Sequence, residues 1–428
     1  MKKFNTSIFV FRRDLRIEDN TGLTEALQTS NNVILLFVMD PRQLENNEYI
    51  SENSLRFMFG ALKDLKTHIN KKGSTLWIIK GIAEQEIPKF AALNQADAVY
   101  VNEDYTPFSI TRDLNMAKNL NEKSIALIKC ADYLLTEPRS ILTKQQNPYR
   151  VFSQFYREAL NHSVRNPGFY NYSENYFSGQ LDLSKFSQVS LDRLESDFDA
   201  TRFNGLRLVE RLDVLKDYAV FKDYPALNKT SNLSPHLKFG TVSIREVYWR
   251  ALQNNMTDFI RQLYWRDFFT YLAFHFPYVF EKDFVSYAHN WSHDPVKFRN
   301  WTEGRTGVPI VDAGMRQLNT ESFIHNRVRL IVASYLVKDL GIDWRMGEKY
   351  FASKLKDYDP SLNNGNWQWV AGTGADPRTR YRKLNPWIQQ KKYDPDCTYI
   401  KKYVEELRNY DCKNIMNNDK ILKNIYIE

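Results

Sequence analysis

The stretch DYDPSLNNGNWQWVAGTG, residues 357–374, decides how the second half of the chain is interpreted. It combines two aspartates, adjacent asparagines and two tryptophans in one short segment. Taken alone, Asn363 could cap a helix beside Asn364 and Gly365, and Trp367 could be an ordinary core aromatic. The meaning of the stretch therefore depends on the sequence around it.

The segments on its N-terminal side have apolar residues at helical spacing, and they are residues 258–275, 312–318 and 326–340. A strand pattern is absent from the sequence beyond about residue 200. We therefore expect residues 201–428 to form an all-α domain.

The first 130 residues follow a different pattern, in which short apolar runs alternate with helical segments. This pattern predicts a parallel, five-stranded, doubly wound sheet covered by helices on both faces. The expected strands are residues 7–11, 33–39, 75–79, 98–101 and 125–130. Residues 131–200 lose this periodicity and gather Pro, Ser and Asn, which predicts an interdomain connector between an α/β domain at 1–130 and the helical domain.

Composition restricts the function further. Lys and Arg number 59 against 51 for Asp and Glu, a net charge of +8 that suits a polyanionic partner, although a solvated basic surface would look the same. An aromatic content of 14% suits a planar cofactor or nucleobases. Neither a Gly-rich dinucleotide fingerprint nor a Gly-Lys-Ser/Thr loop occurs.

Three cysteines, Cys130, Cys397 and Cys412, are too few and too scattered for a disulfide framework or a metal or cluster site. We therefore expect a reducing compartment and no metal. Apolar runs are too short to cross a bilayer, which predicts an intracellular protein without a membrane.

Six motifs occur in a fixed order, FVFRRDLRIEDN (9–20), TSNLSPHLKFG (230–240), QLYWRDFF (262–269), GRTGVPIVDAGMRQL (304–318), HNRVR (325–329) and the stretch at 357–374. In this order they resemble the DNA photolyase/cryptochrome family, most closely its class I cyclobutane pyrimidine dimer photolyases of microbial type. The resemblance implies an antenna-type α/β domain, a helical domain that holds a U-shaped FAD, and a carbon–carbon lyase activity on damaged DNA.

The resemblance also implies which residues bind FAD. Hydroxyls and backbone donors ahead of a helix at 230–234 suit a pyrophosphate, although Ser234 could simply be a helix N-cap before Pro235. Arginine forks and aspartates suit phosphate, ribose or the flavin ring, although each could be a surface ion pair. The implied set is Tyr218, Thr230, Ser231, Asn232, Leu233, Ser234, Phe259, Gln262, Arg266, Arg329, Asp357, Asp359 and Asn363.

The implied catalytic residues are an electron-transfer triad, the residue that faces flavin N5 and a residue that contacts the lesion. Trp367 matches the triad member nearest the flavin, Trp344 the middle one and Trp291 the one nearest solvent. Asn363 matches the position facing N5, where the photolyase-like branches have a neutral amide. Gln262 matches the lesion-contacting position.

The resemblance also implies which residues contact the lesion and the DNA. Trp265 and Trp369 match the pair that flanks a flipped pyrimidine dimer. The implied lesion- and DNA-binding set is Lys222, Trp265, Asn326, Arg327, Leu330, Trp369, Arg382 and Gln389. Arg378, Arg380 and Lys383 extend this basic run, although Arg378 and Arg380 could be a solvated charged face.

Two departures bear on the substrate. Gln262 stands where dimer photolyases usually have glutamate, and a neutral amide should repair less efficiently. The same glutamine occurs in the (6-4) and cryptochrome branches, but Asn326 and Leu330 stand where the (6-4) branch has histidines. His325 adjoins the site and could be a proton donor, although a structural histidine is the favoured interpretation.

We therefore expect light-dependent repair of cyclobutane pyrimidine dimers by electron transfer from photoexcited reduced FAD. The alternatives are a cryptochrome-type photoreceptor, (6-4) photoproduct repair, and DNA binding without light chemistry. We also expect UV-damaged double-stranded DNA as partner, a monomer, and a cytoplasmic location, or a nuclear one in a eukaryote. A second antenna chromophore, either folate, deazaflavin or a second flavin, would lie near residues 40–43 and 102–105.

Overall fold

The computed structural model describes residues 2–45, 47–168, 175–286, 290–375 and 383–417. Contacts divide the chain into two units that alternate along the sequence. The first unit comprises Met1–Ile50, Ser54–Val214 and Ser231–Pro277, and the second comprises Ser51–Asn53, Leu215–Thr230 and Tyr278–Glu428. The expected domain boundaries at residues 130 and 200 stay a prediction.

The first unit contains a six-stranded sheet in the order β5-β4-β1-β2-β3-β6. The five predicted strands are parallel to their neighbours, and a short sixth strand from the expected connector pairs antiparallel with β3. The strands are β1 Phe4–Phe11, β2 Ser30–Met39, β3 Leu76–Lys80, β4 Ala98–Asn102, β5 Ala126–Cys130 and β6 Ser187–Gln188. The sheet therefore has the order reversal at β1 that marks a ligand-binding edge in doubly wound folds.

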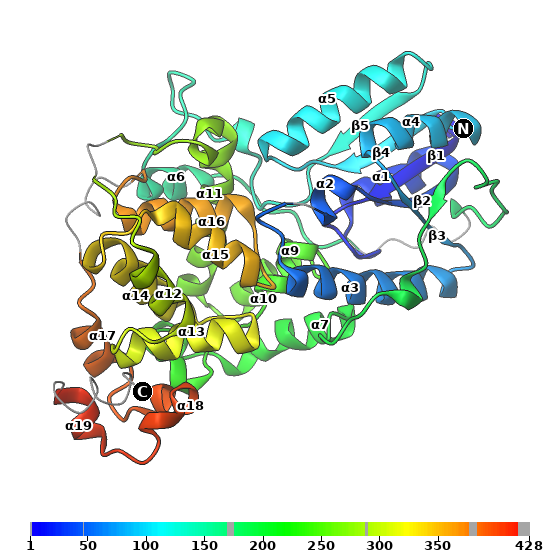
Figure 1. Cartoon of the computed structure of the whole chain (residues 1–428). Helices are drawn as coiled ribbons and strands as arrows, with labels where there is room; N and C mark the ends of the chain where they lie inside the picture. The colour runs from blue at the N-terminus through cyan, green and yellow to red at the C-terminus, as the bar shows by residue number, and fades with distance from the viewer. Residues whose placement is uncertain (1, 46, 169–174, 287–289, 376–382, 418–428) are drawn as a thin grey trace. The chain divides into compact units, whose positions relative to one another are not determined.

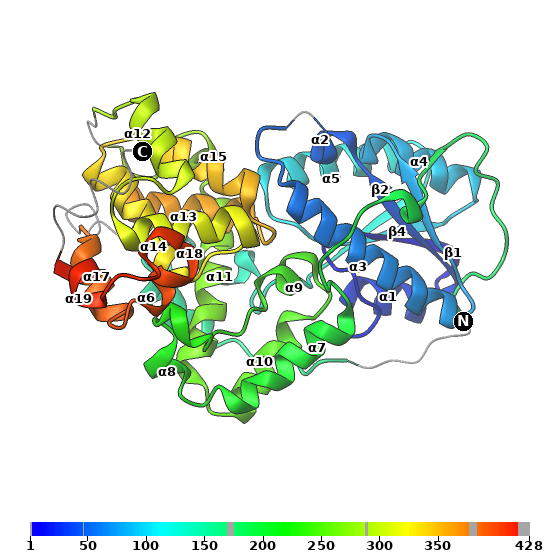
Figure 2. The ribbon, with the colours of Figure 1, turned by 60° about the horizontal axis from the view of Figure 1, so that its bottom comes forward.

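Helices cover both faces of this sheet, because alternate side chains of the central strands are apolar in both directions. Phe9 and Phe11 pack with side chains from α1 and α3, whereas Ile8 and Val10 pack with side chains from α4 and α5. Figures 1 and 2 show these helices beside the sheet. The covering helices are α1 Thr21–Thr29, α3 Glu52–Lys71, α4 Ala83–Leu93 and α5 Pro107–Asn121, and the short α2 is Pro41–Leu44.

The other helices of the first unit are α6 Phe152–Ala159, α7 Arg202–Glu210, α9 Ser234–Phe239, α10 Ile244–Gln253 and α11 Thr257–His275. Helix α9 ends at Gly240, whose φ of +66° is left-handed. A Cβ there would lie 2.5 Å from the carbonyl oxygen of Arg13, so glycine lets the helix end approach the loop after β1. This contact lies within the first unit.

The second unit has no strand among its described residues. Its helices are α8 Tyr218–Phe221, α12 Pro295–Glu303, α13 Pro309–Glu321, α14 Asn326–Ser334, α15 Trp344–Lys354, α16 Pro360–Ala371, α17 Pro386–Tyr393, α18 Thr398–Tyr403 and α19 Cys412–Asn417. Helix α14 runs into a π-helical turn at Tyr335–Asp339, where the sequence predicts a continuous helix. In the described part of the chain, no helix has the length and apolar character that a membrane span requires.

Both units also contain short 3₁₀ turns, at Pro138–Ser140, Leu191–Arg193, Arg211–Val214, Pro225–Leu227, Pro277–Phe280 and Glu405–Leu407.

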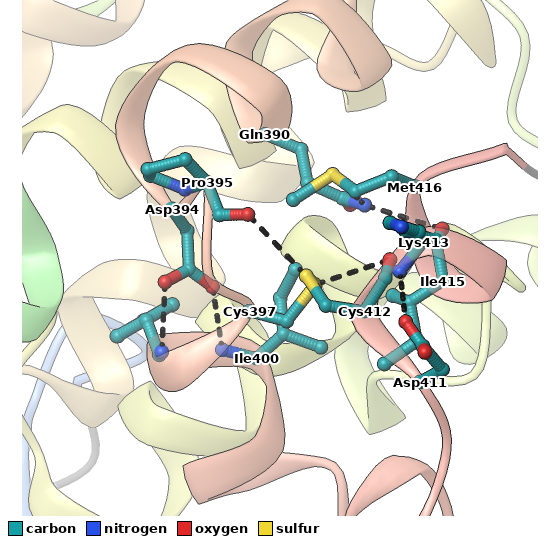
Figure 3. Close-up of a disulfide and its surroundings, with 11 residues drawn as sticks. Gln390, Asp394, Pro395, Cys397, Ile400, Asp411, Cys412, Lys413, Ile415 and Met416 are labelled. Carbon is teal, nitrogen blue, oxygen red and sulfur yellow. Dashed lines mark hydrogen bonds between the residues drawn. A yellow bond between two sulfur atoms is a disulfide. The ribbon is translucent and has the colours of Figure 1, made fainter.

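Cys397 and Cys412 form one disulfide, which the expectation of no disulfide framework did not include. They are 15 residues apart in the sequence, yet their Cα atoms lie 5.7 Å apart because the chain turns back between α18 and α19 (Figure 3). Cys130 is free and buried. The reducing compartment inferred from the cysteine count therefore loses its support.

Candidate cofactor and nucleic-acid site

The predicted site residues belong to both units. Those of the first unit are Ser231, Asn232, Leu233, Ser234, Phe259, Gln262, Trp265 and Arg266. Those of the second unit are Tyr218, Lys222, Thr230, Trp291, Asn326, Arg327, Arg329, Leu330, Trp344, Asp357, Asp359, Asn363, Trp367, Trp369 and Gln389. Arg382, with Arg378 and Arg380, lies outside the described residues.

The predicted pyrophosphate loop runs directly into α9. Ser231 Oγ accepts a hydrogen bond from the Leu233 N–H at 3.4 Å, and Asn232 has a left-handed φ of +56°. Ser234 is the first helical residue, and Leu233 occupies the cap position without a side-chain bond. The alternative of Ser234 as an N-cap was therefore wrong, which leaves its hydroxyl without a capping role.

Three predicted flavin contacts share one side of α11, because Phe259, Gln262 and Arg266 are spaced by three and four residues. The Arg266 guanidinium lies 3.8 Å from the centroid of the Tyr133 ring and donates to the Tyr133 carbonyl at 3.0 Å. It also contacts Asp267 at 3.3 Å, and burial raises the pKa of Asp267 to about 7. Sequence reasoning assigned no role to either anchor of Arg266. Tyr133 is 133 positions away in the sequence, and Asp267 lies within the motif at 262–269.

Trp265, a predicted lesion-stacking residue, already has a stacking partner. Its ring lies 3.6 Å from that of Phe152, with an angle of 8° between the planes. Phe152 begins α6 in the segment expected to be a connector. One face of the Trp265 indole is therefore covered by Phe152, and the rings of Phe268 and Phe269 also lie close to it, all within the first unit.

The Asn363 side chain is oriented by a residue of α15. Its Nδ2 donates to the backbone carbonyl of Glu348 at 3.0 Å, and Asn364 Nδ2 donates to the Glu348 carboxylate at 3.3 Å. Because the donor is engaged, the Asn363 carbonyl oxygen is the atom left to accept from a ligand N–H. Asn363 lies inside α16, whose cap is Asp359, so the capping alternative was wrong.

Arg329 and Asp357, two predicted flavin contacts, form an ion pair at 2.9 Å. The Arg329 Nε also donates to the carbonyl of Ile324 at 2.9 Å, so the guanidinium has a fixed position. The structure thus brings together two residues that the sequence separates by a complete helix.

The predicted triad belongs to one hydrophobic core. Trp344 and Trp367 are 1% and 3% exposed, and Trp291 packs against the same core with partial burial. Trp344 Nε1 donates to the Asp283 carboxylate at 3.1 Å. Sequence reasoning missed Trp301, which is fully buried with its ring centroid 6.2 Å from that of Trp367.

Two predicted lesion contacts have polar atoms without partners. Trp369 Nε1 and Gln389 Oε1 are buried, and neither has a hydrogen-bond partner among the described residues. Leu330 packs against the core of the second unit, and Asn326 begins α14. Buried polar atoms without partners are rare, so these two suit a ligand that supplies the missing bonds.

His325 has a structural role at the start of α14. Its Nδ1 accepts from the Arg327 N–H at 3.2 Å. Burial, helped by Arg327 and Arg329, lowers the pKa of His325 to about 4, so the imidazole is neutral near pH 7. A neutral acceptor is poorly suited to act as the proton donor of (6-4) repair.

The first unit thus contains a parallel sheet covered by helices, and the described part of the second unit is all-helical with tryptophans packed in one core. Residues 7–168 match the family model described as DNA photolyase, and residues 259–425 match the FAD binding domain of DNA photolyase. The chain belongs to the DNA photolyase family.

Individual relatives are similar to this chain along nearly its whole length. The deoxyribodipyrimidine photo-lyase of Synechococcus sp. is 34% identical over 439 residues, which cover 96% of this chain and 90% of the relative. An archaeal photolyase from Sulfolobus tokodaii with two FAD molecules is 44% identical with a TM-score of 0.85, over 96% of this chain and 93% of that one. A cryptochrome from Synechocystis sp. PCC6803 is 27% identical with a TM-score of 0.90, over 100% and 95%. The expected family and fold class are confirmed.

Proposed function

We propose that this protein is a light-driven lyase that repairs cyclobutane pyrimidine dimers in double-stranded DNA as a monomer. The observation that carries the proposal is the similarity, along nearly the full chain, to proteins named deoxyribodipyrimidine photo-lyase. Its place of action is the DNA of the cell, in the cytoplasm or in a eukaryotic nucleus.

The residues present fit an FAD, because Asn363 has an acceptor oxygen without a partner among the described residues and Arg329 is fixed beside Asp357. When bound, reduced FAD supplies the electron that light makes available for splitting the dimer. Asn363 would accept a hydrogen bond from the flavin ring, while the Glu348 carbonyl holds the amide in this orientation. The residues that would hold the cofactor are Arg266, Arg329 and the loop at 230–234, together with Tyr218, Phe259, Asp357 and Asp359.

The lesion is held by stacking and neutral hydrogen bonds. Trp369 and Trp265 would replace the base stacking that a flipped dimer loses. Gln262 donates to and accepts from the pyrimidine edge. Lys222, Arg327, Arg382 and Gln389 contact the DNA backbone or the lesion strand, with Asn326 and Leu330 beside the lesion. Trp291, Trp344 and Trp367 would serve as the electron-transfer triad that supplies electrons to the bound cofactor.

A second flavin is proposed at the carboxyl edge of the sheet, because the Sulfolobus tokodaii relative holds two FAD molecules. The Arg112 side chain is 7% exposed, and its Nη2 has no hydrogen-bond partner within the described chain. Arg42 and Arg112 lie 4.9 Å and 5.8 Å from the Phe108 ring centroid. Chromophore extraction and mass spectrometry test this, since two FAD per chain support it and folate or deazaflavin would contradict it.

A cryptochrome-type photoreceptor without repair activity is the second candidate. It is favoured by Gln262 and by the similarity to the Synechocystis cryptochrome. Repair of (6-4) photoproducts is less favoured, because Asn326, Leu330 and a neutral His325 offer no ready proton donor.

Blue-light repair by the purified, flavin-reduced protein tests these alternatives. Two duplex oligonucleotides are compared, one with a cyclobutane dimer and one with a (6-4) photoproduct, each with a dark control. Repair of the cyclobutane dimer alone supports the proposal. Repair of neither substrate, with flavin photoreduction intact, leaves the photoreceptor.

A further inference from the structure

Arg327 and Asp223 form an ion pair in the second unit. Arg327 Nη2 lies 2.9 Å from one Asp223 carboxylate oxygen, and Arg327 Nε donates to the other at 3.2 Å. The two planar groups therefore meet through two contacts, which is the strong geometry for an arginine with an oxyanion. The side chains are 17% and 30% exposed, so solvent and solutes reach the pair.

Arg327 is held by more than this carboxylate. Its guanidinium lies 4.5 Å from the centroid of the Tyr393 ring, and its backbone N–H is bonded to His325 Nδ1. Tyr393 is itself buried and packs edge-on against Tyr224, the neighbour of Asp223 in sequence. The guanidinium should therefore keep its place when the negative charge of Asp223 is removed.

A phosphate diester presents two oxygens to a guanidinium in the same way as a carboxylate. Asp223 occupies the positions that a phosphate would take on Arg327. A phosphate that approaches Arg327 must displace this carboxylate and also meets its negative charge at short range. The ion pair thus reduces the binding free energy that a phosphate gains by contacting Arg327.

We propose that Asp223 restrains DNA binding by competing with the phosphate for Arg327, and so limits the affinity for undamaged duplex. The inference rests on the proposed function, in which Arg327 contacts the DNA backbone. Asp223 is a competing residue in this scheme and takes no part in the photochemistry.

Binding of an undamaged fluorescent duplex, measured by anisotropy from about 50 mM to about 300 mM salt, tests the inference. The Asp223→Asn variant should bind roughly three- to five-fold more tightly at the lowest salt. Its plot of log affinity against log salt should be steeper by about 0.9, because one more phosphate is neutralised. Asp223→Glu restores the charge and should return both values to those of the unmodified protein.

Glu406→Gln is the matched control. Glu406 pairs with Arg316 at 2.6 Å with side-chain exposures of 39% and 19%, so the change removes the same charge from a similar pair elsewhere in the unit. The control should bind DNA as the unmodified protein does. Thermal melting establishes that each variant is folded, and Asp223→Ser replaces the asparagine variant if that one does not fold.

The outcomes distinguish a failure of the Asp223 inference from a failure of the proposed function. A weaker or unchanged affinity of Asp223→Asn would overturn the inference, and so would an equal gain in Glu406→Gln, which would reflect net charge alone. If the unmodified protein has no salt-dependent affinity for DNA, the proposed function fails instead.

Discussion

A single hydrogen bond selects which atom of Asn363 is left for a ligand. An amide has both a donor and an acceptor, and the sequence does not distinguish which of them faces a cofactor. The Glu348 carbonyl engages the donor at 3.0 Å, so the acceptor remains. The side chain of Glu348, which is buried beside Asn364, adds a titratable group to this position.

Glu348→Gln should reduce the dependence of stability on pH. Burial raises the pKa of Glu348 from 4.5 to about 7, so the folded protein binds this proton more tightly than the unfolded chain. Its contribution is fully present below the unfolded pKa and is lost as the pH rises through the folded pKa. Between about pH 5 and about pH 8 the unmodified protein should lose on the order of 2 kcal/mol more than the variant. Urea unfolding at both pH values checks this, and parallel curves would refute it.

Gly347→Ala should disturb Trp367. A Cβ at residue 347 would lie 2.3 Å from Trp367 Cη2 and 2.5 Å from Leu336 Cδ2, both inside the core. We expect the overpacking to lower the free energy of unfolding by about 1–3 kcal/mol and to slow flavin photoreduction. Urea unfolding and photoreduction under constant illumination measure the two effects. Unchanged stability would mean that the ring has room to move.

Gln262→Glu should increase repair. A charged carboxylate makes hydrogen bonds worth about 1.5–3 kcal/mol, against about 0.5–1.5 kcal/mol for a neutral amide. We expect a several-fold gain in the quantum yield of dimer repair at equal flavin content. The comparison uses the same dimer-containing duplex for both proteins, and a lower yield in the variant would show that the neutral side chain is the adapted one.

Helices α17, α18 and α19 are held together by bonds between elements that are individually short. Gln390 of α17 donates to the carbonyl of Ile415 in α19 at 3.4 Å. The Asp394 carboxylate accepts from the N–H groups of Tyr399 and Ile400 at 2.9 Å each, which caps α18. The disulfide joins the start of α18 to α19, as Figure 3 shows. Helices this short are not stable alone, so these contacts maintain them.

Loss of the disulfide should therefore destabilise the second unit. The disulfide closes a loop that reduces the conformational entropy of the unfolded chain. In the chain-entropy description, a loop of this length contributes about 3 kcal/mol to the free energy of unfolding. Cys412→Ser should lower the melting temperature, and a reductant should lower that of the unmodified protein to a similar value. The variant is its own control, because the reductant should leave its melting temperature unchanged.

A buried ion-pair network joins three distant parts of the first unit. Arg245 of α10 contacts Asp19 at 2.8 Å and Asp132 at 2.6 Å, and Arg16 contacts Asp132 at 2.6 Å. All four side chains are at most 4% exposed. The network connects the loop after β1, the segment after β5 and a helix more than a hundred positions further along the chain.

Arg245→Met should lower the free energy of unfolding by about 3–5 kcal/mol, because it removes the buried arginine that pairs with both carboxylates and leaves each of them with one other arginine. Arg165 is the matched control, since it contacts the same Asp19 at 2.7 Å but is 44% exposed. Arg165→Met should cost about 1 kcal/mol or less. Urea unfolding of both variants measures the difference, and equal losses would show that burial does not decide the effect.

Hydrophobic periodicity in the sequence determined five parallel strands and the main helices. Apolar residues on a buried face must recur at the spacing of the element, which differs between a strand and a helix. The six motifs determined the family, because local residue order carries that information directly. The candidate site could be predicted only as a set of positions, such as Asn363 or Arg327, without the partners that orient them.

Only the tertiary structure decided those partners. The Cys397–Cys412 disulfide, the bond from Asn363 to Glu348, the Asp223 carboxylate on Arg327 and the Phe152 ring on Trp265 each join residues that periodicity does not relate. The physical reason is that such contacts depend on where whole helices pack, and packing is set by many apolar side chains together. A pattern of neighbouring residues does not state which helices pack together, so it cannot predict contacts between side chains of different helices.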